Sequence, residues 1–164
     1  MKLFQSTLIV AAISAISLSA LAHEGHHDKE KKAAVKKEQK EWGIAGDAKN
    51  VKRTIKLSMS DAMRFTPDQI NVKQGETVRI SLKNTGKMLH EIVIGTKTEL
   101  DEHAALMVKF PTMEHEEPYM AHVAPGKTGE IIWTFNKSGK FDFACLIAGH
   151  YQSGMVGKIN VAAK

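Results

Sequence analysis

The stretch CLIAGHYQSGM, near the C-terminus, carries residue types that could hold a soft metal ion. It runs from Cys145, the only cysteine among 164 residues, through His150 to Met155. A thiolate, an imidazole and a thioether together suit copper, which in electron-transfer sites binds two histidines, a cysteine and a more distant methionine. Such a site needs one more histidine from elsewhere in the chain.

The second histidine is best supplied by His90, which heads the apolar stretch HEIVI. It directly follows a predicted turn, where a neighbouring strand could present it to the loop between Cys145 and Met155. Each residue alone has an ordinary explanation, because free cysteine behaves as a small hydrophobe, methionine often fills cores and histidine is commonly half-buried. Together with His150, the four residues predict a type 1 copper site.

The N-terminal segment 1–22 has the pattern of an export signal. Lys2 precedes an apolar run over residues 8–18, and residues 20–22 read Ala-Leu-Ala, a typical cleavage site. The apolar run is too short to span a bilayer, although an uncleaved membrane anchor remains the alternative. We expect the mature chain to begin at His23, to be periplasmic and to have no stable membrane insertion.

Charge and cysteine usage narrow the class of protein further. The formal net charge is +5, from 23 basic and 18 acidic residues that are interspersed. Nucleic-acid binding requires basic residues gathered on one surface, so we expect no nucleic-acid partner. Cys145 has no cysteine within the chain to pair with. In an exported protein an odd cysteine is notable, since small exported domains often use cysteines in pairs.

Residues 51–164 have the alternating pattern of a β-sheet domain. Thr54–Met59 and Thr77–Leu82 alternate polar and apolar residues, as half-buried strands do. Further strands, separated by glycine, proline or asparagine turn signals, are predicted at Glu91–Ile94, Glu130–Phe135, Lys140–Cys145 and Lys158–Val161. Many short strands joined by turns favour an all-β fold, a Greek-key β-sandwich.

Residues 23–50 differ in composition from the β domain. They are rich in lysine and glutamate, lack sustained apolar periodicity and include histidines at positions 23, 26 and 27. This composition predicts a flexible, His-rich charged tail, with nascent helix around Lys29–Glu41. Short histidine tracts bind metals weakly, and a solvated tail without function is an equally open interpretation.

A helix is predicted within an insertion over about 96–123. Residues Thr98–Phe110 space their apolar side chains at helical intervals, with Thr98 and Asp101 as the expected cap and Pro111 as the end. The apolar positions of this helix are Leu100, Ala104, Met107 and Val108.

The same insertion contains candidate ligands for a second copper ion. Thioether and imidazole groups suit Cu(I), and neighbouring glutamates add negative charge. The alternative is that the methionines fill the core while the histidines are solvated. The candidate ligands are His103, Met107, Met113, His115, Met120 and His122.

The order of HEIVI and GKFDFACLIAGHYQSGMVGKINV resembles that of the cupredoxins, the single-domain type 1 copper proteins that include azurin, plastocyanin and rusticyanin. The resemblance covers about residues 54–161. It is closer to the periplasmic copper-resistance cupredoxins (CopI-like), through the sequence AMRFTPDQINVKQGETVRI, the His-rich tail and the insertion. It implies that His90, Cys145 and His150 are equatorial copper ligands and that Met155 is the axial ligand.

Two positions depart from better-known cupredoxins. Ala148 stands where azurin-like loops usually carry proline, so the ligand loop is expected to be less rigid. Glu91 follows the first ligand where many blue copper proteins have asparagine or a hydroxyl residue. Groups beside the ligands tune potential and geometry, so the resemblance leaves open whether the site is blue or green.

We therefore expect a monomeric, copper-binding protein of the periplasm that contributes to copper tolerance. Its expected partners are copper ions and a periplasmic redox or copper-handling protein. The alternative is a soluble electron carrier that donates to a respiratory reductase or oxidase through His150.

Two other classes fit less well. Multicopper oxidases and copper nitrite reductases need a further copper centre, and such oxidases carry repeated H-x-H pairs that this sequence lacks. We expect no enzyme, because the length admits a single sandwich. A structural zinc module is disfavoured because methionine is not a usual zinc ligand.

Overall fold

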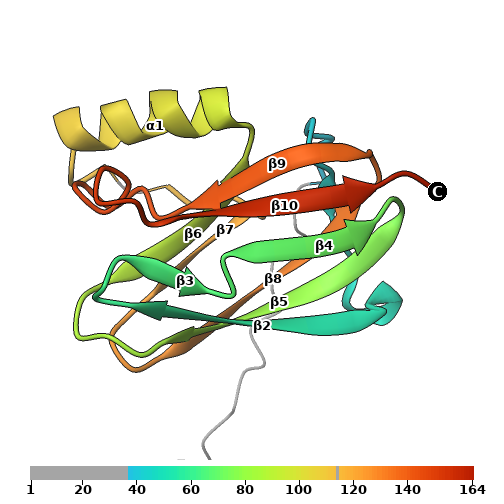
Figure 1. Ribbon diagram of the computed structural model, residues 1–164, viewed down its shortest axis with the longest axis horizontal. Helices are drawn as coiled ribbons and strands as arrows, with labels where there is room; N and C mark the ends of the chain where they lie inside the picture. Colours follow the sequence, from blue (N-terminus) through green and yellow to red (C-terminus); the bar gives the residue numbers. More distant parts are fainter. Residues whose placement is uncertain (1–36, 114) are drawn as a thin grey trace, which may run out of the picture. The chain divides into compact units, whose positions relative to one another are not determined.

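The computed structural model describes residues 37–113 and 115–164. Within these ranges the strands form two five-stranded sheets, shown in Figure 1. The predicted signal segment 1–22 and the tail histidines at positions 23, 26 and 27 lie outside the described residues.

The first sheet has the strand order β1-β8-β5-β2-β3. Strands β2 and β5 run parallel, and the other neighbours run antiparallel. The bounds are β1 (Ile44–Ala45), β8 (Thr128–Phe135), β5 (Glu76–Asn84), β2 (Arg53–Ser60) and β3 (Arg64–Thr66). A short 3₁₀ helix, Ala48–Asn50, lies between β1 and β2.

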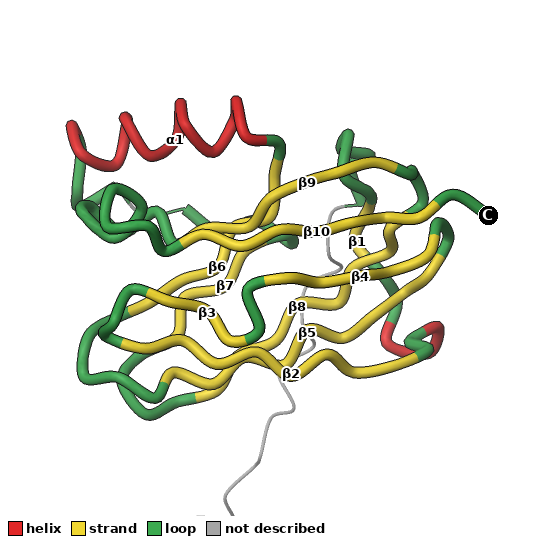
Figure 2. Tube along the Cα trace, in the orientation of Figure 1, coloured by secondary structure: helices red, strands yellow, loops and turns green. Residues whose placement is uncertain are grey.

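The second sheet has the strand order β4-β10-β9-β6-β7, with β4 and β10 parallel. Its strands are β4 (Gln69–Lys73), β10 (Val156–Ala162), β9 (Gly139–Ala144), β6 (His90–Gly95) and β7 (Met120–Val123). The chain changes sheet between β3 and β4, β4 and β5, β5 and β6, β7 and β8, and β8 and β9 (Figure 2). The predicted all-β sandwich is confirmed.

The core lies between the inner faces of the two sheets. Along β5 the alternate residues Val78, Ile80 and Leu82 are fully buried, as the sequence period predicts. Phe143 on β9 faces Gly157 on β10, and a Cβ at Gly157 would lie 2.1 Å from the phenyl ring. Glycine is needed at this position because the ring occupies the space that any larger residue would fill.

Helix α1 (Lys97–Lys109) packs on the outer side of β6 and β9. Leu100, Ala104 and Met107 are buried there, whereas Val108 is 55% exposed. The expected helix therefore exists, but Val108 does not belong to its buried face. The helix advances about 100° per residue, so the position after Met107 points away from the sheet.

The helix cap also differs from the prediction, which named Thr98 and Asp101. The Thr96 hydroxyl accepts the Glu99 backbone N–H, while the Glu99 carboxylate accepts the Thr96 backbone N–H. This reciprocal pair satisfies two amide groups that the first turn of a helix leaves free. The helix consequently begins earlier than the apolar spacing indicated.

The folded part also begins earlier than residue 51, where the sequence predicts the start of the β domain. Trp42 is 3% exposed, and its ring meets that of Tyr119 edge to face at a centroid distance of 5.4 Å. Its carbonyl oxygen accepts a hydrogen bond from Trp133 Nε1 at 3.0 Å. A single tryptophan among charged residues creates no periodicity, yet it buries a large apolar area. Trp42 therefore packs into the core of the β domain although it precedes the predicted start of that domain.

We predict that Trp42→Ala lowers the free energy of unfolding by about 3–5 kcal/mol, as truncation of a buried aromatic residue usually does. Denaturant unfolding of the variant measures this change. The matched control is Lys49→Ala, since Lys49 is exposed and its truncation should have little effect. Equal stabilities of the two variants would exclude Trp42 from the core.

Candidate metal centre

The loop between β9 and β10 is folded back on itself by backbone hydrogen bonds. Cys145 N–H donates to the Met155 carbonyl at 3.0 Å, and Met155 N–H donates to the His150 carbonyl at 3.1 Å. Gly149, directly before His150, has φ of +89°, a conformation that favours glycine. These bonds bring Cys145, His150 and Met155, which are spaced five residues apart, close together within one loop.

His90 is positioned by the turn that precedes β6. Asn84 is fully buried and donates from Nδ2 to the carbonyls of Met88 and Val123, each at 2.8 Å. Its Oδ1 accepts the Gly86 N–H at 2.8 Å. The sequence indicates only an asparagine turn signal here and does not reveal this role. The available clue was an asparagine in the turn six residues before a candidate ligand.

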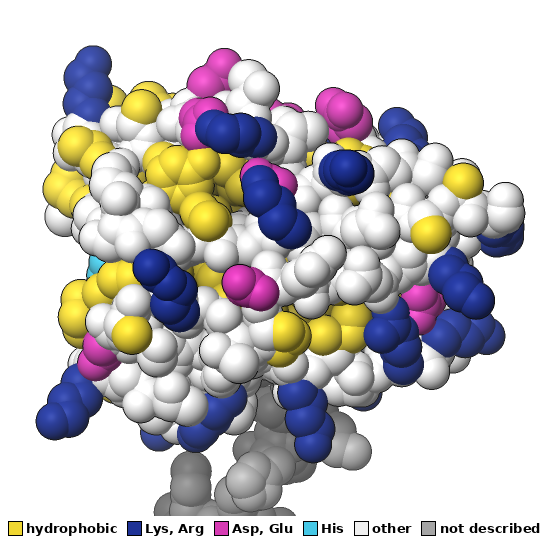
Figure 3. All heavy atoms as spheres, in the orientation of Figure 1, with side chains coloured by type: hydrophobic (Ala, Val, Ile, Leu, Met, Phe, Trp, Pro, Cys, Tyr) yellow, Lys and Arg dark blue, Asp and Glu magenta, His cyan; other side chains and the backbone are white. Residues whose placement is uncertain are grey.

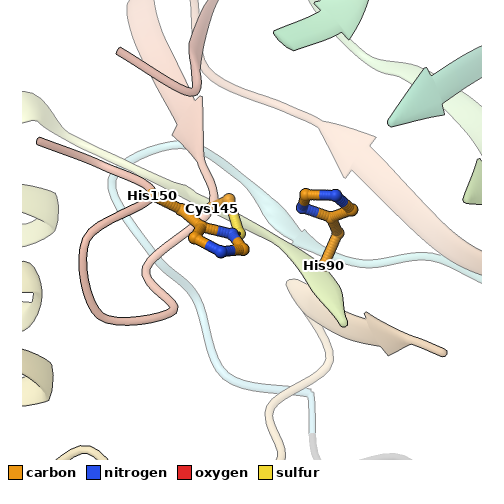
Figure 4. Close-up of side chains that lie close together, drawn as sticks. All are labelled: His90, Cys145 and His150. Atoms are coloured by element: carbon orange, nitrogen blue, oxygen red, sulfur yellow. The ribbon is translucent and has the colours of Figure 1, made fainter. Parts of the chain in front are cut away.

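The side chains of His90, Cys145 and His150 converge from these two elements (Figure 4). All three are buried, and one ligand atom of each lies within 4.8 Å of those of the others. Cys145 Sγ lies 3.3 Å from His150 Nδ1. His90 Nδ1 is buried without a hydrogen-bond partner. A sulfur, two imidazoles and an unpartnered ring nitrogen form a donor set that fits copper.

Met155, the predicted axial ligand, is fully buried at the end of the same loop. Its backbone bonds to both Cys145 and His150, so the residue starts beside them. Its side chain also belongs to the main hydrophobic core. The structure thus places the backbone of Met155 beside Cys145 and His150.

The environment of Cys145 and His150 favours their neutral forms. Burial raises the pKa of the Cys145 thiol to about 12, although the Glu91 N–H, 3.4 Å from Sγ, opposes this shift. Burial and the neighbouring His90 lower the pKa of His150. A metal cation that binds here must therefore displace the proton of the thiol.

Glu91 connects the ligand loop to strand β7. Its carboxylate is fully buried; Oε1 accepts the Leu146 N–H at 2.8 Å, and Oε2 lies 2.9 Å from His122 Nε2. The register of β6 and β7 places Glu91 directly opposite His122. Burial raises the pKa of Glu91, and the hydrogen bond from Leu146 opposes that rise. Sequence analysis named Glu91 but could not give these partners.

Asp61 also contacts the site, and sequence analysis did not name it. It lies in the turn between β2 and β3, and its Oδ1 is 3.0 Å from His90 Nε2. The N–H of Lys87 donates to Oδ2 at 2.7 Å, and this bond lowers the pKa of Asp61. The carboxylate joins the first sheet to His90, the first residue of β6.

The histidines of the insertion form a second cluster beside α1. The ring centroids of His103 and His115 are 4.5 Å apart, and those of His115 and His122 are 6.2 Å apart. Both ring nitrogens of His115 are buried without a hydrogen-bond partner. Met113, which is 40% exposed, lines with His115 and His122 a hollow of about 720 Å³.

The other two methionines of the predicted second set are packed. Met107 and Met120 are 3% and 7% exposed and belong to a small hydrophobic cluster with Leu100 and Leu146. Met120 and His122 lie on β7, a strand that sequence analysis did not predict within the insertion. Among the described residues, the trio of His90, Cys145 and His150 is the group of such side chains that converges within 4.8 Å.

The surface near the centre is apolar. Met88 and Leu89, which precede His90, are each 43% exposed, and Phe110 is 50% exposed. Figure 3 shows hydrophobic side chains gathered at the end that carries the ligand loop, while lysines and arginines are dispersed over the face in view. No helix within the described ranges has the length and apolar character needed to cross a membrane.

Residues 51–162 match the family described as "Copper binding proteins, plastocyanin/azurin family". The copper-resistant cuproprotein CopI of Rubrivivax gelatinosus is 44% identical over 154 residues, which cover 94% of this chain and 93% of that protein. The protein of the same name from Pseudomonas aeruginosa is 37% identical over 149 residues, covering 73% and 82%.

Solved structures show the same fold. Dithionite-reduced auracyanin of Roseiflexus castenholzii has a TM-score of 0.58 and 21% identity, covering 68% of this chain and 98% of that one. Auracyanin B has a TM-score of 0.60 and 15% identity, with 73% and 94% covered. At such identities these likenesses concern the fold alone.

We predict that metal binding releases about one proton from Cys145, because the thiol is protonated at pH 8 and must ionise to bind. Titration of the metal-free protein with Zn(II), by calorimetry in buffers of different ionisation enthalpy, gives this number. The Cys145→Ser variant should not release this proton on metal binding. Equal proton release by the variant would show that other groups supply it.

Proposed function

This chain belongs to the plastocyanin/azurin family of copper-binding proteins, and on that premise we propose that it is an exported periplasmic cupredoxin that contributes to copper tolerance. The observation that carries the proposal is the buried trio of His90, Cys145 and His150. The names of the relatives, copper-resistant cuproproteins, support a role in tolerance. The pattern of residues 1–22 supports export.

The proposed ligands are His90, Cys145, His150 and Met155, in a type 1 site. Copper bound there supplies a centre that exchanges one electron between Cu(II) and Cu(I). The chain contributes a buried, hydrogen-bonded frame: the loop closes through Cys145 and Met155, and Glu91 N–H donates to the sulfur. Such a frame holds the ligands in one arrangement and keeps water from them.

We predict that the Cu(II)-loaded protein has intense thiolate-to-copper absorption and that Cys145→Ser abolishes it, because the band requires the copper–sulfur bond. Visible absorption and electron spin resonance of both proteins measure this. Survival of the band in Cys145→Ser would exclude a type 1 site.

The axial position needs a separate variant. Met155→Leu preserves the volume of the buried side chain and should leave the core packed. We expect the absorption band to remain while the reduction potential changes, because the axial ligand tunes it. An unchanged potential would indicate that Met155 serves packing alone.

We further propose that the insertion holds a second copper ion, as Cu(I). The candidate ligands are His103, His115, His122 and Met113, which the geometry favours over the packed Met107 and Met120. Three features support this: the short distance between the His103 and His115 rings, the unpartnered nitrogens of His115 and the exposed thioether beside them. A Cu(I) ion would satisfy the buried nitrogens.

Glu91 is proposed to couple the two sites. Its backbone N–H contacts the sulfur of Cys145, and its carboxylate lies against His122. A cation near His122 would act on the same buried carboxylate that holds the ligand loop through Leu146. Through Glu91, a change of charge at the histidine cluster would act directly on the type 1 site.

A soluble electron carrier is the second candidate function. The exposed Met88 and Leu89 favour it, because an apolar surface beside a redox centre suits contact with a protein partner. In both candidate functions we propose that the protein is not an enzyme. A respiratory reductase or oxidase would be its partner in this alternative.

We predict that deletion of the gene impairs growth on elevated copper and leaves respiratory growth intact. Growth curves under both conditions test this. The wild-type gene should restore tolerance, and the double variant Met113→Leu, His115→Ala should restore it only in part. Impaired respiration with normal copper tolerance would favour the electron carrier.

The same double variant should bind one Cu(I) fewer than the wild type in an anaerobic titration, while its type 1 absorption persists. Its matched control is Met120→Leu, which alters a packed methionine and should leave the stoichiometry unchanged. An unchanged stoichiometry in the double variant would remove the second site and leave the type 1 proposal intact.

A further inference from the structure

Asp61 makes a hydrogen bond to the ligand His90 from the opposite sheet. His90 begins β6 in the second sheet, whereas Asp61 follows β2 in the first. The carboxylate oxygen Oδ1 lies 3.0 Å from His90 Nε2. A carboxylate only accepts hydrogen bonds, so Nε2 carries the ring proton and donates it.

This contact decides which nitrogen of His90 faces the metal centre. With the proton on Nε2, the lone pair of the ring lies on Nδ1. Nδ1 is the buried atom without a hydrogen-bond partner, and His90 stands within ligand distance of Cys145 and His150. Asp61 therefore holds the ring in the tautomer that a metal requires.

The carboxylate is fixed by the turn that leads to His90. The N–H groups of Lys87 and Met88 donate to Oδ2 at 2.7 Å and to Oδ1 at 3.3 Å. A Cβ at Gly86 would lie 1.9 Å from Oδ1, so glycine makes room for the carboxylate. The turn residues Gly86, Lys87 and Met88 thus hold the Asp61 carboxylate in place.

We propose that Asp61 is a positioning residue that fixes the tautomer of His90 and, through its negative charge, lowers the reduction potential of the copper. A carboxylate bonded to a ligating imidazole makes that ligand more basic. A basic ligand and a nearby negative charge both favour Cu(II), the more positive ion, over Cu(I). The inference rests on the proposed type 1 site.

The test compares Asp61→Asn with Asp68→Asn. The first keeps an acceptor oxygen for His90 but removes the charge. The second removes the same charge from an exposed turn between β3 and β4 and serves as the matched control. Redox titration of the copper-loaded proteins, followed at the thiolate absorption band, should show a more positive potential for Asp61→Asn and a nearly unchanged one for Asp68→Asn.

An unchanged potential in Asp61→Asn, or an equal shift in both variants, would overturn the proposal. The tautomer is tested on the wild type by nitrogen NMR of the Cu(I)-loaded protein, which needs no variant to fold. The His90 proton should reside on Nε2 and exchange slowly with solvent. A proton on Nδ1 would overturn the proposal.

Failure of this inference differs from failure of the proposed function. A wild-type protein without thiolate absorption would overturn both. A wild-type protein with the absorption band, whose potential does not respond to Asp61→Asn, would retain its type 1 site and lose only the role of Asp61.

Discussion

The hydrogen-bond register of strand β6 is the constraint on which the metal centre depends. β6 lies between β9 and β7, pairing Val93 with Ala144 on one side and Glu91 with His122 on the other. Side chains alternate between the two faces of a strand, so a slip by one residue would exchange His90 and Glu91. The same register brings one ligand to the cysteine and a carboxylate to the histidine cluster.

The metal centre also contains buried polar groups, of which only some have hydrogen-bond partners. Burial of an unpaired polar group costs free energy, so most such groups have partners. Glu91 Oε1 accepts a hydrogen bond from Leu146, and Oε2 lies 2.9 Å from His122 Nε2 in a contact that lacks hydrogen-bond geometry. His90 Nδ1 has neither kind of partner among the described residues. The trio is thus surrounded by hydrogen bonds while one of its ring nitrogens has no partner, an arrangement that suits a preorganised metal site.

Helix α1 and β7 tie the insertion to the centre. The Tyr151 hydroxyl, in the ligand loop, donates to Asp101 Oδ1 on α1 at 2.5 Å. Beneath it, Leu146 packs with Leu100 and Met107. Because loop and helix share both polar and apolar contacts, the histidine cluster beside α1 lies against the same loop that holds Cys145 and His150.

The sequence by itself determined the local features. Alternation revealed the long strands β2, β5, β8, β9 and β10, and the spacing of Cys145, His150 and Met155 indicated the ligand loop. The position of His90 after a turn was sufficient to name it. Each of these signals lies within a few residues of chain, where side-chain type and period directly reflect conformation.

Only the tertiary structure decided the partners of those features. Asp61 lies 3.0 Å from a histidine that follows it by 29 residues, and Trp42 packs on Tyr119. β7 became a strand because it pairs with β6, although its sequence was read as part of a helical insertion. Such contacts depend on the pairing of strands that are distant in sequence, and local periodicity does not specify which strands will pair.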